Sequence, residues 1–204
     1  MSGSKNNVGE SVDPDVNDVP MKQWAAGGPA TLFLLGVLHI GLFEFATSGD
    51  RGPLTPVLGL WILSISAPLI ILAIIELRRG EILFGTLGMV FGGLLGFGAG
   101  FSFIRGLFLP GPSVMDGYWF LGASIIFFLL IPAMLRTSRL MSVMFVDIGT
   151  ALFLIGLYLA DFFGTDQLPL TISGWMALIF SISCFYMATA QITNAQYGKR
   201  IMPY

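Results

Sequence analysis

The side chains of this sequence that could do chemistry are few and lie far apart. Its 204 residues include a single histidine, His39, and a single cysteine, Cys184. Hydrolysis needs a nucleophile beside a base, and metal binding needs a cluster of His, Cys or carboxylate ligands. His39 and Glu44 are five residues apart, which places them about 140° apart around a helix, so they do not share a face. The sequence therefore predicts no catalytic residue, no metal site and no cofactor.

Asp147 is more informative than the other acidic residues because it lies inside a long apolar stretch. A lone carboxylate at such a position costs roughly 3 kcal/mol on membrane-insertion scales. Two interpretations stay open. Asp147 either borders a water-filled path and tunes permeation, or it bonds to Ser142, Arg139 or a neighbouring helix.

Six long apolar stretches, separated by short polar gaps, hold these residues. Hydrophobic residues make up 55% of the sequence and charged residues 11%, whereas soluble domains carry about 25% charged residues. Most stretches approach the roughly 20 apolar residues that a helix needs to cross a bilayer, and none shows the alternation of a barrel strand. They cover Thr31–Ala46, Val57–Ile75, Ile82–Ile104, Tyr118–Leu135, Met141–Phe163 and Leu168–Ala190. The prediction is an all-α integral membrane protein with six transmembrane helices per protomer.

Composition divides the chain into three parts. Residues 1–24 are polar and acidic and predict a disordered tail, residues 25–190 predict the six-helix transmembrane domain, and residues 191–204 predict a cytoplasmic C-terminal tail. The spans leave no room for a nucleotide-binding domain, and no Walker-type phosphate loop occurs, so ATP-driven pumping by this chain alone is not expected. A net charge of −2 gives no indication of nucleic-acid binding.

Positive charges alternate between the polar gaps and predict the orientation. With six spans, Arg51 and Arg105 fall on one side, and eight basic residues fall on the other. The eight are Lys5, Lys22, Arg78, Arg79, Arg136, Arg139, Lys199 and Arg200. Because cytoplasmic loops carry the excess of Lys and Arg, both termini are expected in the cytoplasm. The expected location is the cell membrane, which means the inner membrane in a Gram-negative bacterium.

A ladder of glycines recurs every four residues in the third span. The spacing predicts a nearly straight strip without side chains, on which a helix of the same or another protomer packs closely. The alternative is a pore lined by bare glycine, with Phe91 among the neighbours that shape its opening. The ladder comprises Gly88, Gly92, Gly96 and Gly100.

Polar residues also mark the predicted cytoplasmic ends of the spans. Glu76, Arg78 and Arg79 indicate a structural turn cluster between spans 2 and 3. A second set follows the last span, and its members either cap the helix and dock the tail or take part in substrate entry. This set is Gln191, Asn194 and Gln196.

Three segments carry a family pattern. The end of the chain reads Gly174-Trp175, Tyr186-x-Ala188, Asn194-x-Gln196-Tyr197-Gly198-Lys199 and finally Met202-Pro203, and the turn after span 2 reads Glu76-Leu77-Arg78-Arg79-Gly80 before Phe84-Gly85. Both resemble the acetate uptake transporter family, also called the succinate–acetate permease or YaaH family. Before span 1, Gly27-Gly28-Pro29-Ala30-Thr31-Leu32 keeps only part of the family signature Asn-Pro-Ala-Pro-Leu-Gly-Leu. The resemblance is therefore to a divergent member.

The resemblance implies a homohexamer in a lipid bilayer, in which each protomer holds a narrow hydrophobic pore for small monocarboxylates such as acetate. The implied constriction falls on Phe91, in place of a family tyrosine, on Ile148, and on Leu35, for which Phe33 and Gly36 are alternatives. Four further residues are expected along the path: Asp147, Ser183, Cys184 and His39.

Three functions stay open at this level. The first is a channel or transporter for a small monocarboxylate, with or without proton coupling. The second is a channel of the same fold for a neutral or cationic solute such as urea, an amide, a protonated acid or ammonium, because an ionised Asp147 would repel an anion. The third is a membrane scaffold or sensor without transport, which the glycine ladder would suit.

Overall fold

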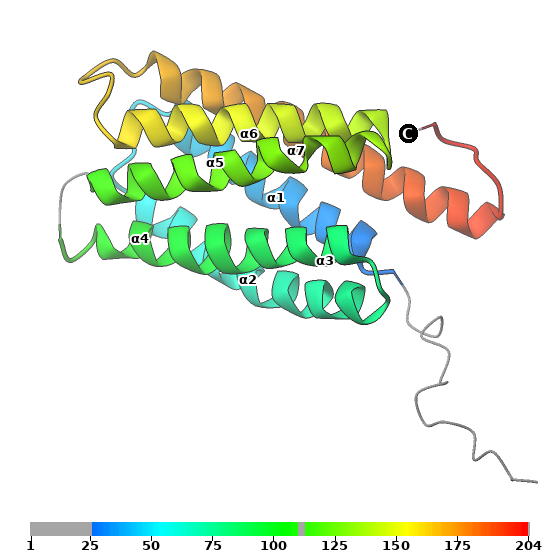
Figure 1. The fold of residues 1–204 in the computed structure, drawn as a ribbon. Coiled ribbons are helices and arrows are strands. Elements are labelled where there is room, and N and C mark those ends of the chain that lie inside the picture. Colours follow the sequence, from blue (N-terminus) through cyan, green and yellow to red (C-terminus); the bar gives the residue numbers. More distant parts are fainter. Residues whose placement is uncertain (1–25, 110–112, 204) are drawn as a thin grey trace, which may run out of the picture.

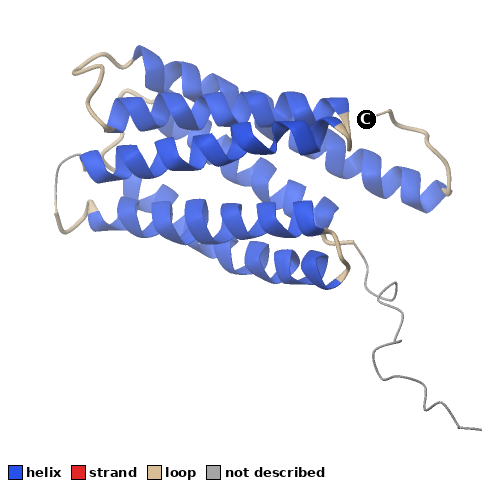
Figure 2. Cartoon of the chain, viewed as in Figure 1, coloured by secondary structure: helices blue, strands red, loops and turns tan. Residues whose placement is uncertain are grey.

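The computed structural model describes residues 26–109 and 113–203, which form a bundle of helices packed side by side (Figures 1 and 2). The helices are α1 (Gly28–Thr47), α2 (Leu54–Arg78), α3 (Ile82–Met89), η3 (Val90–Gly98), α4 (Ala99–Arg105), α5 (Val114–Leu135), α6 (Arg139–Leu159) and α7 (Leu168–Tyr197). Because α3, the π-helix η3 and α4 follow one another without a break, the described residues contain six helices long and apolar enough to cross a membrane. The predicted fold class is confirmed, whereas the side on which the termini lie stays a prediction. The predicted tail of residues 1–24 lies outside the described residues.

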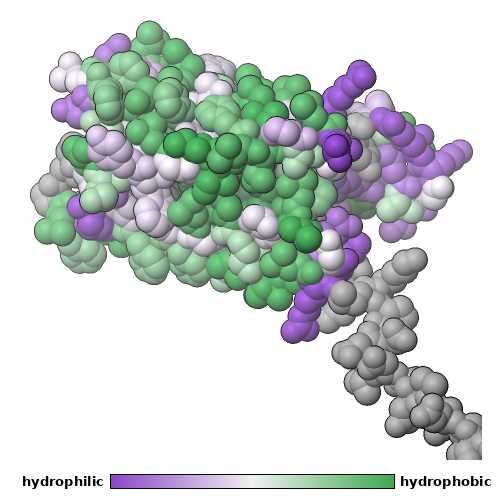
Figure 3. Space-filling model, viewed as in Figure 1, coloured by the Kyte–Doolittle hydropathy of each residue, from purple (hydrophilic) through white to green (hydrophobic). Residues whose placement is uncertain are grey.

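The surface of the bundle fits a lipid environment. Figure 3 shows hydrophobic residues over the middle of the visible face and hydrophilic residues gathered at its two ends. Large apolar side chains such as Leu60, Ile71 and Leu129 are more than half exposed. Exposed apolar surface of this extent marks contact with a membrane or with other protein chains.

The six spans close into a ring. Around it, the α3–η3–α4 span contacts α2, α2 contacts α1, α1 contacts α7, α7 contacts α6, α6 contacts α5, and α5 returns to η3. The α5–η3 contact is the least extensive of the six. One cluster of buried apolar side chains draws members from all six spans. The interior of the ring is thus where any path between the two ends of the bundle would run.

The glycine ladder packs against α2 within the same chain. A Cβ atom built on Gly88 would lie 2.7 Å from the Cβ of Ala73, and one built on Gly100 would lie 2.7 Å from a methyl carbon of Leu63. Four residues of an α-helix over-rotate by about 40°, so a purely α-helical ladder would drift away from α2. The wider π-helix η3 falls short of a full turn over four residues, and it brings the ladder back onto α2.

The last helix runs further than the apolar stretch that predicted it. α7 continues from Ala190 to Tyr197 and ends at Gly198, which adopts the left-handed conformation with φ of 62° that favours glycine. Beyond it the chain folds back onto α7. Asn194 Oδ1 accepts the N–H groups of Ile201 and Met202 at 2.6 and 2.9 Å, and its Nδ2 donates to the Met202 carbonyl at 2.8 Å. The geometry of Asn194 therefore matches the tail-docking interpretation.

Candidate functional site

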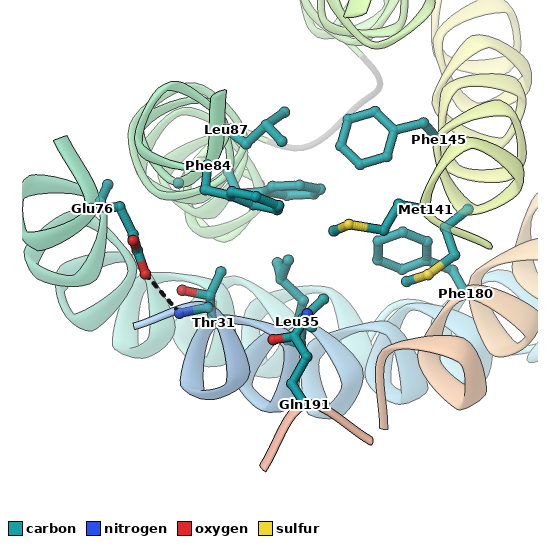
Figure 4. Close-up of a pocket in the computed structure, with 15 residues that line it drawn as sticks. Thr31, Leu35, Glu76, Phe84, Leu87, Met141, Phe145, Phe180 and Gln191 are labelled. Atoms are coloured by element: carbon teal, nitrogen blue, oxygen red, sulfur yellow. Dashed lines mark hydrogen bonds between the residues drawn. The ribbon is translucent and has the colours of Figure 1, made fainter. Parts of the chain in front are cut away.

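A cavity opens at the end of the ring where α1 begins and α7 ends (Figure 4). Its volume is about 40 Å³, and one water needs roughly 10–15 Å³, so it admits a few water-sized groups. The wall is mainly apolar and comes from α1, α2, the third span, α6 and α7. Its large apolar members are Leu32, Leu35, Phe84, Leu87, Phe91, Met141, Met144, Phe145 and Phe180, and its polar side chains are Thr31, Glu76 and Gln191. We call it the inner cavity.

Glu76 joins two spans at the wall of the inner cavity. The residue is 4% exposed, and its Oε1 accepts the N–H of Gly28, the first residue of α1, at 2.9 Å. Its Oε2 lies 3.5 Å from Nε of Arg79. Negative charge is favourable at a helix N-terminus because the unpaired N–H groups point toward it. The interpretation as a turn cluster was correct for Glu76 and Arg79 but missed the link to α1 and the cavity.

A second cavity lies on the other side of Phe91, toward the opposite end of the ring. It also measures about 40 Å³. Its lining comprises Leu38, His39, Leu42, Ile62, Phe91, Leu95, Ala99, Phe103, Phe120 and Leu152. We call it the outer cavity. Of the residues that the structure describes, Phe91 alone belongs to the walls of both cavities. Its ring is thus part of the partition between two apolar spaces that lie in series inside the ring of helices.

Aromatic rings surround Phe91 on several sides. The ring centroid of Phe91 lies 5.0 Å from Phe127 of α5, 6.3 Å from Phe180 of α7 and 6.5 Å from His39 of α1. His39 is 3% exposed, and its Nδ1 lies 2.7 Å from the carbonyl oxygen of Leu35. A carbonyl only accepts, so Nδ1 carries the proton in this bond. Phe91 is therefore packed against side chains of three other spans.

The residues predicted for the constriction occupy different places. Leu35 lines the inner cavity, Phe91 lines both cavities, and His39, predicted for the path, lines the outer cavity. Ile148 is 2% exposed in the common core cluster but belongs to neither cavity wall. The structure thus brings Leu35, Phe91 and His39 together around the partition.

The remaining predicted path residues lie on α6 and α7 and outside both cavity walls. Cys184 is fully buried, and Ser183 beside it is half-buried. Asp147 is half-buried, and its Oδ2 is buried without a hydrogen-bond partner among the described residues. The Ser142 hydroxyl donates to the Ser138 carbonyl at 3.0 Å. Ser142 is therefore not the hydrogen-bond donor to Asp147 that one interpretation assigned.

Phe180 and Phe127 are parts of the partition that sequence reasoning missed. Both are at most 2% exposed. A signal for Phe180 was present, because Phe180, Cys184, Met187 and Gln191 follow the spacing of one helix face. An apolar face of a membrane helix, however, does not reveal whether it points to lipid or to the interior. Within the described ranges, no three His, Cys, Asp or Glu side chains are placed to hold a metal ion.

Comparison with known proteins adds a strong likeness of fold. No protein-family model matches the sequence, and no curated protein matches it. A solved structure titled "Structure of the bacterial acetate channel SatP" matches with a TM-score of 0.73 and 17% sequence identity, over 89% of this chain and 99% of that chain. At this identity the likeness shows the fold. The chain therefore has the six-span fold of that acetate channel, as its resemblance to the acetate uptake transporters predicted.

Proposed function

We propose that the chain is a membrane channel or transporter protomer that passes small monocarboxylates such as acetate. The observation that carries the proposal is the pair of apolar cavities in series, which meet at Phe91 inside the ring of six spans. The fold of a bacterial acetate channel supports the same conclusion. A path of this kind selects by size and by the cost of removing water from the solute.

The proposed constriction centres on Phe91, with Leu35 on its inner side and Ile148 in the surrounding core. A carboxylate that crosses it must lose most of its hydration, because the cavity walls on both sides are largely apolar. The methyl group of acetate suits this environment, and each added CH₂ enlarges the solute at the narrowest point. Acetate and formate are thus expected to pass more readily than lactate.

The proposal extends to assembly and to the rest of the path. In it, six copies associate in the cell membrane, and Asp147, Ser183 and Cys184 influence the path from the contact between α6 and α7. The large exposed apolar side chains of the spans leave ample surface for copies to meet. Native mass spectrometry of the detergent-solubilised protein tests the assembly, and a predominant dimer or monomer would contradict it.

Flux into proteoliposomes tests the function. The assay compares acetate, formate, lactate, urea and ammonium across pH, with empty liposomes as the control. Acetate flux above that of empty liposomes is expected, and a current carried by acetate at neutral pH identifies the ionised form as the solute. Flux of urea or ammonium without acetate would replace the proposal with a channel for neutral or cationic solutes.

One observation favours that second candidate enough to include it. Glu76 lies in the wall of the inner cavity, and Asp147 lies on α6 with a buried carboxylate oxygen. An ionised carboxylate near a path repels anions. For Glu76 this repulsion is offset, because its charge faces the N–H of Gly28 and Arg79. Among the described residues, the buried Oδ2 of Asp147 has no hydrogen-bond partner that would offset its charge in this way. The Asp147→Asn variant separates the candidates, since it should raise acetate flux if the anion passes near this carboxylate.

The substitution Phe91→Ala tests the partition directly. It removes a ring that forms part of the partition between the two cavities, so lactate flux should rise by about tenfold relative to acetate. Leu60→Ala is the matched control, because Leu60 is exposed on the outer surface. An unchanged ratio of lactate to acetate in Phe91→Ala would remove Phe91 from the path.

A further inference from the structure

The contact between α5 and η3 closes the ring, and the side chain of Trp119 forms its centre. The indole Nε1–H of Trp119 donates to the carbonyl oxygen of Leu94, in the middle of the π-helix, at 3.0 Å. The same indole covers Gly98 at the end of the π-helix, where a built Cβ atom would lie 2.7 Å from ring carbon Cζ2. Trp119 therefore contacts η3 at two points, one polar and one steric.

This hydrogen bond is not what a tryptophan near the end of a membrane helix usually makes. Trp and Tyr at the membrane surface keep their polar group in the headgroup region and anchor the helix there. Trp119 is 45% exposed, yet its N–H is used on the main chain of another span. The indole thus links α5 to the backbone of η3 rather than to lipid headgroups.

The π-helix that Trp119 holds is also the segment that carries Phe91. Phe91 is its second residue and lies three positions before Leu94. α3 and α4 on either side are fixed to α2 by the glycine ladder. An α-helix winds further per residue than a π-helix, so rewinding η3 as an α-helix would rotate one flank against the other. Phe91 would then leave its place between the two cavities.

We propose that Trp119 is a positioning residue for the path: by holding Leu94 and Gly98 it keeps η3 π-helical and Phe91 in the partition, and so sets the size selectivity. The proposal rests on the proposed function, because it assumes that solute passes Phe91. The glycines of η3 are the reason that this segment needs the contact with Trp119. Four glycines lie within Val90–Gly98, and glycine stabilises a regular helix less than other residues apart from proline.

The variant Trp119→Phe tests the role, since it keeps an aromatic ring over Gly98 but removes the N–H donor. The measurement is the ratio of butyrate to acetate flux in proteoliposomes. Loss of a hydrogen bond of ordinary strength should raise the ratio of butyrate to acetate flux by about two- to tenfold. Trp175→Phe is the matched control, because Trp175 is 54% exposed on α7 and packs by its ring on Phe43. The control should leave the ratio unchanged.

Two further variants distinguish positioning from a general loss of stability. Gly98→Ala displaces the indole without altering Trp119, and it should raise the ratio in the same direction. In a Phe91→Ala background, Trp119→Phe should change the flux ratio no further, because both substitutions act through the phenyl ring of Phe91. A lower thermal unfolding midpoint of Trp119→Phe with an unchanged flux ratio would overturn the proposal, as would full additivity with Phe91→Ala.

The wild-type protein separates this proposal from the one on which it rests. Absence of any acetate flux in the wild type would contradict the proposed function. Acetate flux in the wild type, together with an unchanged butyrate ratio in Trp119→Phe and Gly98→Ala, would contradict the positioning role alone.

Discussion

The hydrogen bond from Gly28 to Glu76 links the start of the first span to the end of the second at the mouth of the inner cavity. Glu76 is buried, and a buried carboxylate is tolerable when donors face it. Here the carboxylate accepts the first N–H of α1, and the positive charge of Arg79 lies beside it. The contact therefore fixes the angle at which α1 enters the bundle, and with it the place of Leu35 and His39 further along the same helix.

Loss of this carboxylate should destabilise the protein. We expect Glu76→Ala to lower the free energy of unfolding by about 1–3 kcal/mol, because the half-buried N–H of Gly28 loses its acceptor. Glu76→Gln keeps an acceptor oxygen and should cost less than the alanine. Denaturant titration in detergent micelles measures both. Glu81→Ala is the control, since Glu81 is exposed and its side chain caps no helix, and an equal loss in Glu81→Ala would contradict the assignment to the hydrogen bond.

Some of the site was within reach of the sequence, and some was not. The resemblance predicts Phe91 and Leu35 at the constriction, and His39 is a lone polar residue within a predicted span. All three line the cavities. Phe180 could not be assigned to the site, because the sequence of an apolar helix does not show whether a phenylalanine faces lipid or the interior. The Glu76–Gly28 bond joins residues 48 positions apart, and nothing local in either segment indicates the partner.

At the scale of elements, the third span shows how a repeat and a helix type depend on each other. A glycine every fourth residue suits neither helix type alone, because the α-helix over-rotates and the π-helix under-rotates at that spacing. The structure uses both types in one span, α3 and α4 flanking η3. The six spans were predictable from the length of the apolar runs, whereas the π-helix was not, since it changes no property that hydropathy records.

The ladder provides a matched pair of substitutions. A Cβ atom on Gly88 would lie 2.7 Å from the Cβ of Ala73, whereas Gly93 has no neighbouring atom within 4 Å of such a Cβ. Gly88→Ala should lower the free energy of unfolding by about 1–3 kcal/mol through overpacking. Gly93→Ala should be neutral or stabilising by up to about 1 kcal/mol, because alanine is the better helix former. Equal effects in micelle unfolding would show that α2 does not pack on the ladder.

At the scale of the molecule, the closed ring explains why two small cavities matter more than their volume suggests. Cavities in a water-soluble bundle are usually packing defects, but these two lie in series within a bundle whose outer surface suits lipid. Gly28 lies near Gln191, so the first and last spans bring their terminal ends to the same side of the molecule. The inner cavity opens there, and positive charge predicts that this side is the cytoplasm.

Cysteine labelling in intact cells tests that orientation, and the chain is suited to it. The native Cys184 is fully buried, so a membrane-impermeant maleimide should report only introduced cysteines. Asp50, beside Arg51 in the α1–α2 connection, and Thr137, next to Arg136 in the α5–α6 turn, are exposed. These two connections lie at opposite ends of the bundle (Figure 1). The positive-inside rule predicts that Asp50→Cys is labelled from outside and that Thr137→Cys is labelled only after the cells are permeabilised. The reverse pattern would place the inner cavity outside the cell, and labelling of both from outside would contradict the six-span topology. The predicted pattern would make the Glu76 end of the path the one that faces the cytoplasmic solute pool, so that solute taken up by the cell would cross the Phe91 partition before it meets that carboxylate.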